Sequence, residues 1–428
     1  MIDHETMRTK NLGQIFEQIR KSKPHITKRE LQAQTGMSWA TISGSIKWLL
    51  QEGFVVELDN DVMHRNGAKP SNDAMHSIEA APCNETVQKA GRPAKAYDIN
   101  PEKNLLIGVD INVESIQVVL IDMKCRVLNS INRVLIVNDK DSILELTKEM
   151  IQAIIDDSQA IPNQSQKSPN LILGIGFALM GAVDSTNGVA LYMHLIRNWQ
   201  NVDIKTIFEK EFGLPVLVEH DPNCYAIAEM NNGMDTRYNN MVFLRLSLGI
   251  GMCQVVSGRV FKGSTGNAGE IGHVCMDRNG PLCYCGKRGC VEAYASISGI
   301  ARRYMEATGD VDGPATHNSI EDTAIVQRLA AAAASEDQNA KAYFNKAGEV
   351  LGLAIGNMIS LNNPSMVVIG GALAQYEGLY MDRLRQVAGE ICWPYSKVDI
   401  ALTSLQPNGA AVGAAALFVQ QRVWEGLF

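Results

Sequence analysis

The sequence contains no run of apolar residues that approaches the roughly 18 needed to cross a membrane. Its N-terminus (MIDHETMRTKNLGQ) is polar and lacks the apolar core of a signal peptide. It also lacks a net positive charge, since the formal charge is −7, which excludes a protein that coats nucleic acid over its whole surface. Charged residues make up only 20% of the chain and apolar residues 46%, which excludes wholesale disorder. We therefore expect a globular, cytoplasmic protein without a membrane span.

The charge is distributed unevenly along the chain. Residues 1–52 carry eight Lys or Arg and five Asp or Glu, which gives a net charge of +3. Since the whole chain has a net charge of −7, the remaining residues carry −10. The 428 residues are too many for one ordinary domain and predict two or three. A basic segment on an acidic body is typical of a small DNA-binding domain joined to a second module.

The basic segment has the pattern of three short helices. Residues 12–22 place apolar side chains on one helical face and predict the first helix. Thr27, with Glu30 three positions later, forms a capping box that begins the second helix. Ser38 is a good N-cap for the third helix.

Two strands and a long polar segment complete the predicted N-terminal domain. A strand is expected at 54–57, and the returning strand of a hairpin is expected at 97–99. The segment 59–90 between them is polar and weakly patterned, as in a wing loop or linker. This order predicts a winged helix-turn-helix domain over residues 1–100.

In such a domain the N-terminal residues of the third helix reach base edges, and basic residues of the preceding helix contact phosphates. Trp39 has two open interpretations, a base contact or a core residue. One domain of this kind buries too little surface for tight binding, so we expect a homodimer or homotetramer on a palindromic operator. The candidate DNA contacts are Lys28, Arg29, Ser38, Trp39, Thr41, Ser45 and Lys47.

The body begins near residue 105 and repeats one pattern. LLIGVD, IQVVLID and RVLNSI predict three successive strands, and MVFLRLS, MCQVVSG and RVFKG predict three more. Helical segments follow both groups. The repetition predicts a duplicated α/β unit with a cleft between its halves.

Three cysteines and a histidine are concentrated in GEIGHVCMDRNGPLCYCGKRGCVE. His273, Cys283, Cys285 and Cys290 supply four ligands that can close a tetrahedral shell, which predicts one structural zinc ion per chain. A set of unrelated core cysteines is the alternative, and a catalytic zinc is disfavoured because protein ligands would fill all four positions. Cys275 lies nearby and is expected to be buried rather than a ligand.

This stretch resembles the signature of the ROK family, named for repressors, open reading frames and kinases. The signature is Gly-Glu-x-Gly-His followed by Cys-x-Cys-Gly-x-x-Gly-Cys-x-Glu, and the resemblance extends from about residue 105 to the C-terminus. The N-terminal domain and Gly-Arg-Pro-Ala before the body resemble the branch of repressors that respond to xylose, N-acetylglucosamine or glucose. The resemblance implies an actin/hexokinase-like α/β fold with two lobes. Lobe 1 would hold 101–219 plus 405–428, and lobe 2 would hold 220–404 with the zinc loop.

The resemblance also implies a sugar site in the cleft. The general base of the family kinases falls on Asp221, and the remaining sugar contacts fall on Glu270, His273 and Glu292. Asp221 could instead be a helix N-cap, and the two glutamates could be surface charges. His220 departs from the family kinases, which have Asn at that position.

The phosphate loop departs from the kinase pattern. The kinases carry Asp-x-Gly-Gly-Thr, but Asn112, Val113 and Glu114 stand here, so two glycines are lost and a negative charge is gained. Two like charges ~4 Å apart cost about 4 kcal/mol at an intermediate dielectric, which lowers ATP affinity roughly a thousandfold. The loss predicts a protein that is no longer an enzyme.

Together these features predict a DNA-binding repressor of sugar-metabolism genes, controlled by a sugar or sugar phosphate in a kinase-like cleft. One alternative is an ATP-dependent sugar kinase with an added DNA-binding domain. Another is a repressor gated by a sugar-transport protein partner.

Overall fold

The computed structural model forms two compact units, a head of residues 1–104 with 420–428 and a body of residues 105–419. The predicted linker at 59–90 and the Gly-Arg-Pro-Ala stretch lie outside the described residues. Within the described part of the chain, no helix is long and apolar enough to cross a membrane. The structure describes residues 4–22, 25–58, 95–100, 104–135, 139–160, 171–193, 195–232, 236–309, 319–405 and 408–425.

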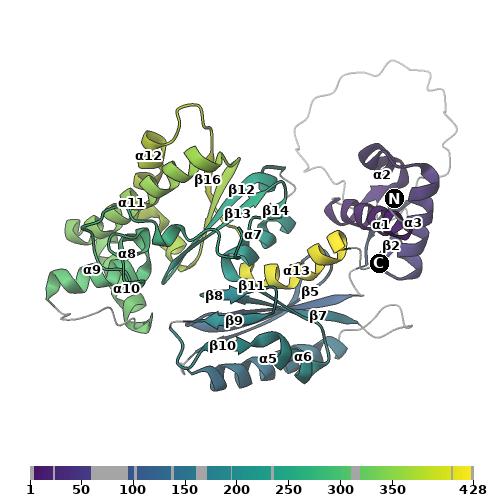
Figure 1. The fold of residues 1–428 in the computed structure, drawn as a ribbon, viewed down its shortest axis with the longest axis horizontal. Coiled ribbons are helices and arrows are strands. Elements are labelled where there is room, and N and C mark those ends of the chain that lie inside the picture. The colour runs from purple at the N-terminus through teal and green to yellow at the C-terminus, as the bar shows by residue number, and fades with distance from the viewer. Residues whose placement is uncertain are drawn as a thin grey trace, which may run out of the picture. The chain divides into compact units, whose positions relative to one another are not determined.

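The head contains the predicted helices and strands in the predicted order (Figure 1). The capping box of Thr27 and Glu30 begins the second helix, and the Ser38 side chain accepts a hydrogen bond from the N–H of Thr41 at the start of the third. The strands pair antiparallel in the order β1-β3-β2. The elements are α1 (His4–Lys21), β1 (Ile26–Thr27), α2 (Lys28–Thr35), α3 (Trp39–Gln51), β2 (Val55–Leu58) and β3 (Ala96–Ile99).

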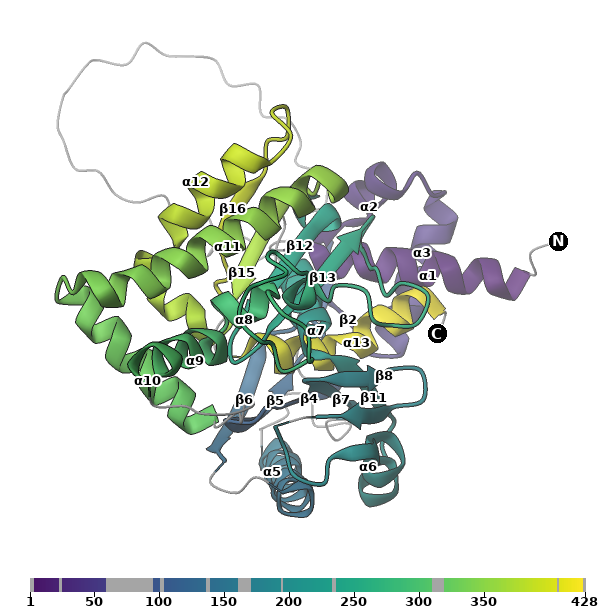
Figure 2. The ribbon, with the colours of Figure 1, turned by 60° about the vertical axis from the view of Figure 1, so that its left-hand side comes forward.

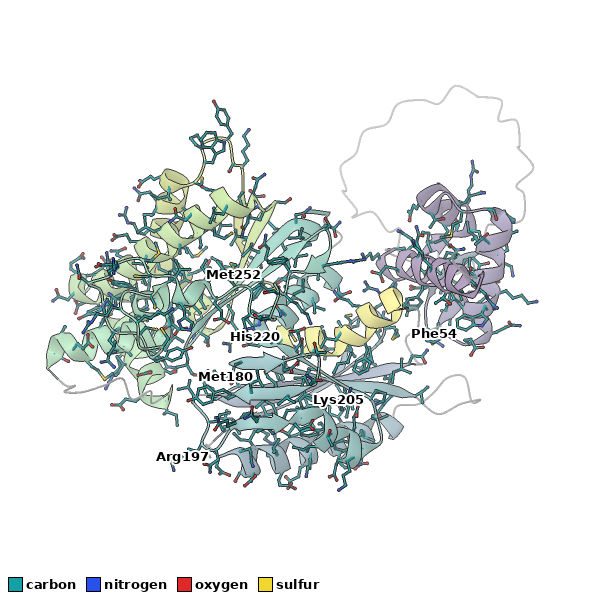
Figure 3. All side chains as sticks on the ribbon, viewed as in Figure 1. Phe54, Met180, Arg197, Lys205, His220 and Met252 are labelled. Carbon is teal, nitrogen blue, oxygen red and sulfur yellow. The ribbon has the colours of Figure 1, made fainter. Side chains whose placement is uncertain are left out.

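The head has its own apolar core, formed by the buried faces of α1 and α3. Phe16 of α1 and Phe54, labelled in Figure 3, meet edge to face with ring centroids 6.1 Å apart, and Trp48 stacks on Phe54 at 6.1 Å. The first helix begins at His4, earlier than predicted. Its first residues are polar and carry no apolar period, so the sequence pattern did not reveal them as helical. The buried residues of the two helices are Leu12, Ile15, Phe16, Ile19, Ile42, Ile46 and Leu49.

The body contains two five-stranded sheets with the same topology. In each sheet an antiparallel meander of three strands is followed by two strands parallel to the first of them, in the orders β11-β7-β4-β5-β6 and β14-β13-β12-β15-β16. This confirms the predicted duplication. The strands are β4 (Leu105–Ile111), β5 (Ser115–Ile121), β6 (Val127–Val134), β7 (Ile172–Leu179), β11 (Val216–His220), β12 (Met241–Leu246), β13 (Ile250–Val256), β14 (Arg259–Val260), β15 (Met366–Gly370) and β16 (Asp399–Leu402).

A small antiparallel sheet of β8 (Ala182–Asp184), β9 (Val189–Tyr192) and β10 (Gln200–Asp203) lies beside the first large sheet. Helices α5 and α6 cover the first sheet, and α8 to α12 gather beside the second (Figure 2). The α-helices that follow the head in the chain are α5 (Lys140–Ala160), α6 (Ile204–Phe212), α7 (Asp221–Asn232), α8 (Val291–Ala295), α9 (Ile297–Thr308), α10 (Ser319–Ala334), α11 (Gln338–Asn362), α12 (Met381–Ile391) and α13 (Gly409–Glu425). Short 3₁₀ helices are η1 (Thr236–Asn240), η2 (Ile271–His273) and η3 (Ala372–Leu379).

The alanine-rich helix α13 packs directly on the first sheet. A Cβ at Gly108 of β4 would lie 1.9 Å from the carbonyl oxygen of Ala411, and a Cβ at Gly176 of β7 would lie 1.9 Å from that of Ala414. Only glycine permits this approach at the two strand positions. The division of the body into lobe 1 (101–219 plus 405–428) and lobe 2 (220–404) stays a prediction.

Candidate functional site

A cavity of about 220 Å³ lies where the carboxyl ends of β7 and β11 face the turn between β12 and β13. Such an edge is where open α/β sheets bind ligands. Met180 and His220, labelled in Figure 3, follow and end these two strands and line the cavity. The four residues that the sequence assigned to a sugar all line the same cavity, namely Asp221, Glu270, His273 and Glu292.

Asp221 is buried at the start of α7 and is held by side chains rather than by a capping role. Its Oδ2 lies 2.9 Å from Nε of Arg245, and its Oδ1 lies 3.4 Å from Nε2 of His220. Both oxygens of this carboxylate therefore lie close to basic side chains of the cavity.

Arg245 is a residue of the cavity that the sequence analysis missed. It projects from β12, and its side chain is largely buried. Burial opposes its charge, but the carboxylates of Asp221 and Asp110 raise the pKa of Arg245. Burial likewise raises the pKa of Asp110 to about 7, although Arg245 opposes this shift. One arginine in the otherwise apolar run MVFLRLS was a signal that could have identified it.

Glu292 is buried in the cavity wall and is not a surface charge. Its Oε2 accepts a hydrogen bond from the N–H of Ile250 at 2.8 Å. A Cβ at Gly249 would lie 2.8 Å from the same oxygen, so the glycine makes room for the carboxylate. Glu270 is exposed and lies at the rim, where its carboxylate borders the cavity.

The four predicted metal ligands converge, and each offers a ligand atom within 4.8 Å of the others. Sγ of Cys285 and Sγ of Cys290 are 3.7 Å apart, as are Sγ of Cys283 and Nδ1 of His273. A tetrahedral zinc ion with bonds of about 2.3 Å to sulfur separates its ligands by about 3.8 Å, so the donors and their spacing fit zinc. The expectation that Cys275 is buried was wrong, since that side chain is exposed.

His273 connects the metal-binding loop with the cavity. Its Nδ1 faces Cys283, and its Nε2 lies 3.0 Å from the hydroxyl of Tyr284, which also lines the cavity. Burial raises the pKa of the Tyr284 phenol, so it stays protonated and can donate a hydrogen bond. A metal held by these ligands would fix the orientation of the imidazole.

The phosphate loop between β4 and β5 is closed by its own side chains. Oδ1 of Asn112 accepts hydrogen bonds from the N–H groups of Glu114 and Ser115, both at 2.9 Å. The carboxylate of Glu114 accepts a hydrogen bond from the Thr323 hydroxyl at 2.9 Å, and Val113 is buried. The amides that a phosphate would need are therefore already satisfied.

The surviving glycines near this loop have packing reasons of their own. A Cβ at Gly251 would lie 2.6 Å from Cγ of Pro222. Gly371, with φ of +97°, would place a Cβ 2.3 Å from the carbonyl oxygen of Leu246. Neither position requires a nucleotide to explain its glycine.

The predicted DNA contacts fall on both faces of α3. Trp39 is 52% exposed, which excludes the core role, and Lys47 is exposed as well. Ser45 is only 8% exposed and lies one turn from Ile42 on the buried face, which counts against a DNA contact at this position.

On the preceding helix, Arg29 is exposed, and Nζ of Lys28 lies 5.8 Å from the centroid of the Tyr97 ring. Ser38 and Thr41 form a hydroxyl pair 2.9 Å apart at the start of α3. The exposed members of the predicted set thus include the first turn of α3.

Known proteins resemble this chain over the body or over its whole length. The model of the family described as ROK matches residues 106–421. The xylose repressor of Caldicellulosiruptor bescii is 23% identical over 399 residues, which cover 92% of each chain. The glucokinase of Thermotoga maritima is 27% identical over 323 residues, which cover 74% of this chain and 98% of that enzyme.

The crystal structure of a transcriptional regulator, described as a homolog of the Escherichia coli MLC protein, superposes with a TM-score of 0.74. It is 25% identical, and the match covers 98% of both chains. The matches to the repressor and the regulator therefore include the head. The match to the kinase covers 98% of that enzyme but only 74% of this chain, which is about the length of the body.

Proposed function

This chain belongs to the ROK family, and we propose that it is a transcriptional repressor of sugar-metabolism genes whose body binds a sugar without phosphorylating it. The observation that carries the proposal is the contrast within one cleft. The four side chains that the family resemblance assigns to a sugar line a single cavity. In the loop that corresponds to the phosphate loop of the kinases, Asn112 and Glu114 instead form hydrogen bonds within the protein. The match of repressor-type relatives across the head supports a regulator rather than an enzyme.

The head is the DNA-binding part of this proposal, as a winged helix-turn-helix domain. Helix α3 would enter the major groove with Trp39 and Thr41 toward base edges, while Arg29 and Lys47 contact phosphates or bases. The exposure of Trp39, Arg29 and Lys47 supports this assignment. Two heads of a homodimer or homotetramer would bind a palindromic operator.

The metal-binding set would hold one structural zinc ion, because four protein ligands leave no open position for chemistry. Its role would be to fix the loop that carries His273 and Tyr284 to the cavity. The hydroxyls of the effector would donate hydrogen bonds to the carboxylates of Asp221, Glu270 and Glu292, which are acceptors suited to vicinal hydroxyls.

A sugar kinase with an added DNA-binding domain is the main competing function. Two contacts count against it. The amides of the phosphate loop are satisfied by Asn112, and the carboxylate of Asp221, which would act as the base, is paired with Arg245. A repressor gated by a sugar-transport protein has no need of the assembled sugar cavity, which is a reason to prefer a direct effector.

Sugar binding between the lobes would change their angle and the spacing of two heads, and so release the operator. The test begins with duplexes that the purified protein selects from random DNA, followed by footprinting with and without D-xylose, D-glucose or N-acetyl-D-glucosamine. We expect a symmetric footprint of two half-sites that one of these sugars removes. An asymmetric footprint of one half-site, or a footprint indifferent to a sugar that binds, contradicts the proposal.

A further inference from the structure

A second cavity of the body lies among helices α9, α10 and α11, which contact one another and lie together in Figure 2. Its volume of about 920 Å³ falls within the roughly 300–1,000 Å³ of sites that hold small organic ligands. None of the described residues that line it also lines the sugar cavity. An inference about this cavity therefore goes beyond the proposed function and does not depend on it.

Arg303 of α9 brings a half-buried positive charge to this cavity. Its Nη2 donates hydrogen bonds to the carbonyl oxygens of Tyr294 at 2.8 Å and of Tyr343 at 3.0 Å. Its guanidinium carbon lies 5.5 Å from the centroid of the Tyr343 ring. Its Nε is buried and has no hydrogen-bond partner, and among the described residues Arg303 forms no ion pair. The guanidinium thus keeps donors that no acceptor of the described chain takes up.

The charge of Arg303 is not balanced by an acidic group. Burial lowers the pKa of Arg303 to about 10, and Tyr343 and Tyr294 oppose this shift. The side chain is therefore still a cation at neutral pH. A buried charge is costly unless an opposite charge accompanies it. Arg245 of the sugar cavity has such a partner in Asp221, whereas Arg303 needs one from outside the described chain.

A second arginine lines the same cavity from α10. Arg328 is exposed, and among the described residues it forms neither an ion pair nor a hydrogen bond. The acidic residue of the described lining is Asp337, which accepts hydrogen bonds from the N–H groups of Asn339 at 2.8 Å and Ala340 at 3.2 Å. Two arginines and one aspartate leave one net positive charge. Paired guanidinium groups are the arrangement that binds phosphate oxygens best.

The cavity also offers aromatic and apolar surface beside these charges. The rings of Tyr304 and Tyr343 both line it and meet edge to face, with centroids 5.8 Å apart. Ile325 and Leu329 of α10 add aliphatic side chains to the lining. Inorganic phosphate would use the arginines alone, whereas a phosphate joined to a carbon skeleton would use both kinds of surface.

We propose that this cavity binds a small organic phosphate monoester through Arg303 and Arg328. The carbon skeleton of the ligand packs on Tyr304 and Tyr343, and the phosphate supplies the opposite charge that Arg303 lacks. Arg303 also donates to a carbonyl of α8, the helix that carries Glu292 into the sugar cavity. The two cavities are therefore connected through one short helix.

Calorimetry on the full chain tests the ligand class with phenyl phosphate, which joins an aromatic ring to a phosphate monoester. We expect saturable binding with a Kd of about 1 mM or below. Inorganic phosphate, which lacks the ring, and benzoate, which lacks the phosphate, should each bind roughly 5-fold more weakly or worse. No saturable binding of phenyl phosphate, or equal binding of either comparison compound, overturns the proposal.

The location of the site is tested with Arg328→Gln, whose exposed position poses little risk to folding. It should weaken phenyl phosphate binding roughly 10-fold or more. The matched control on α9 is Arg302→Gln, at an arginine that pairs with Glu306 and is not among the described lining residues. Arg29→Gln is the control for the basic head. Both controls should keep the affinity within about 2-fold. Unchanged binding by Arg328→Gln overturns the site.

A variant with the opposite expected effect separates ligand binding from a structural role of the arginines. Asp337→Asn keeps a good N-cap for α11 and removes the negative charge of the lining. It should tighten phenyl phosphate binding by roughly 2- to 5-fold, because the phosphate no longer faces a like charge. Weaker or unaltered binding by this variant overturns the placement of the phosphate. Sugar binding is measured separately and decides the proposed function.

Discussion

The sugar side and the nucleotide side of the cleft belong to one fold and have opposite characters. On the sugar side, carboxylates, an imidazole and a phenol converge on an open cavity. On the nucleotide side, Asn112 satisfies the amides of the loop, Val113 is buried, and Glu114 contacts Thr323 across the cleft. Under the proposed function, the difference means that a kinase-like fold keeps its sugar site while the loop that would hold phosphate is engaged in contacts of its own.

Glycines on the nucleotide side support the same comparison. Gly251 and Gly371 remain because Pro222 and the backbone of Leu246 leave no room for a side chain. In the resemblance to the family kinases, the positions where glycine is replaced, in the stretch 112–114, are those whose freedom would serve only the approach of a phosphate. Retention of a glycine is therefore weak support for a nucleotide site unless its neighbours are known.

The largest effect is expected where the sugar side depends on the metal-binding loop. Cys283→Ser/Cys285→Ser should reduce zinc from about one per chain to a trace, and sugar binding should be lost because His273 and Tyr284 are no longer fixed. Metal analysis and calorimetry measure both quantities. Cys392→Ser, at a thiol outside the set, is the control. Normal zinc-free folding and full sugar and DNA binding by the double variant would refute a structural metal.

The closed loop on the nucleotide side predicts that the protein does not turn over ATP. Sugar-dependent ATP consumption should be absent, against the ~1–100 per second of ordinary kinases. A coupled ATP assay, with the Thermotoga maritima glucokinase as positive control, measures it. Turnover in the kinase range would mean that the closed loop opens in solution, and the contrast between the two sides would disappear.

The sugar side is examined directly by removing its carboxylates one at a time. Asp221→Asn and Glu270→Gln should each weaken sugar binding by about 1.5–3 kcal/mol, or roughly 10- to 150-fold. Asp141→Asn, at an exposed helical position outside the cavity, provides the calorimetric control. Unchanged affinity in both cavity variants would place the effector elsewhere.

The smallest effects are expected in the head. Trp39→Ala should weaken operator binding by about 1–2 kcal/mol, roughly 5- to 30-fold, without changing sugar affinity. Arg29→Gln should reduce the salt dependence of binding by about one phosphate contact. Ser45→Ala, on the buried face of α3, serves as the comparison in the same gel-shift titrations. Equal losses in Trp39→Ala and Ser45→Ala would argue against α3 as the recognition helix.

Much of this architecture was predictable from local patterns in the sequence. The capping box at Thr27, the duplicated meander and the metal set each depend on residues close together in the chain, so their signals are strong. The resemblance to a family located Asp221 and Glu292, which lie 71 positions apart along the printed sequence. Periodicity alone could not have placed them in one cavity.

What the sequence did not reveal depends on contacts between distant segments. The pairing of Arg245 with Asp221 and the hydrogen bond between Glu114 and Thr323 join different elements of the body. The burial of Ser45 was not foreseen, because a small polar residue carries no clear preference for either face of a helix. Each of these features follows from tertiary packing rather than from a local pattern.

The central claim is that the sugar side signals without the nucleotide side. The most direct test is to titrate the operator complex with the sugar that binds, with and without magnesium ATP, while following DNA release and the sugar recovered. The account predicts the same release curve in both conditions and sugar recovered unphosphorylated. Release only when ATP is present, or recovery of the sugar as its phosphate, would contradict it.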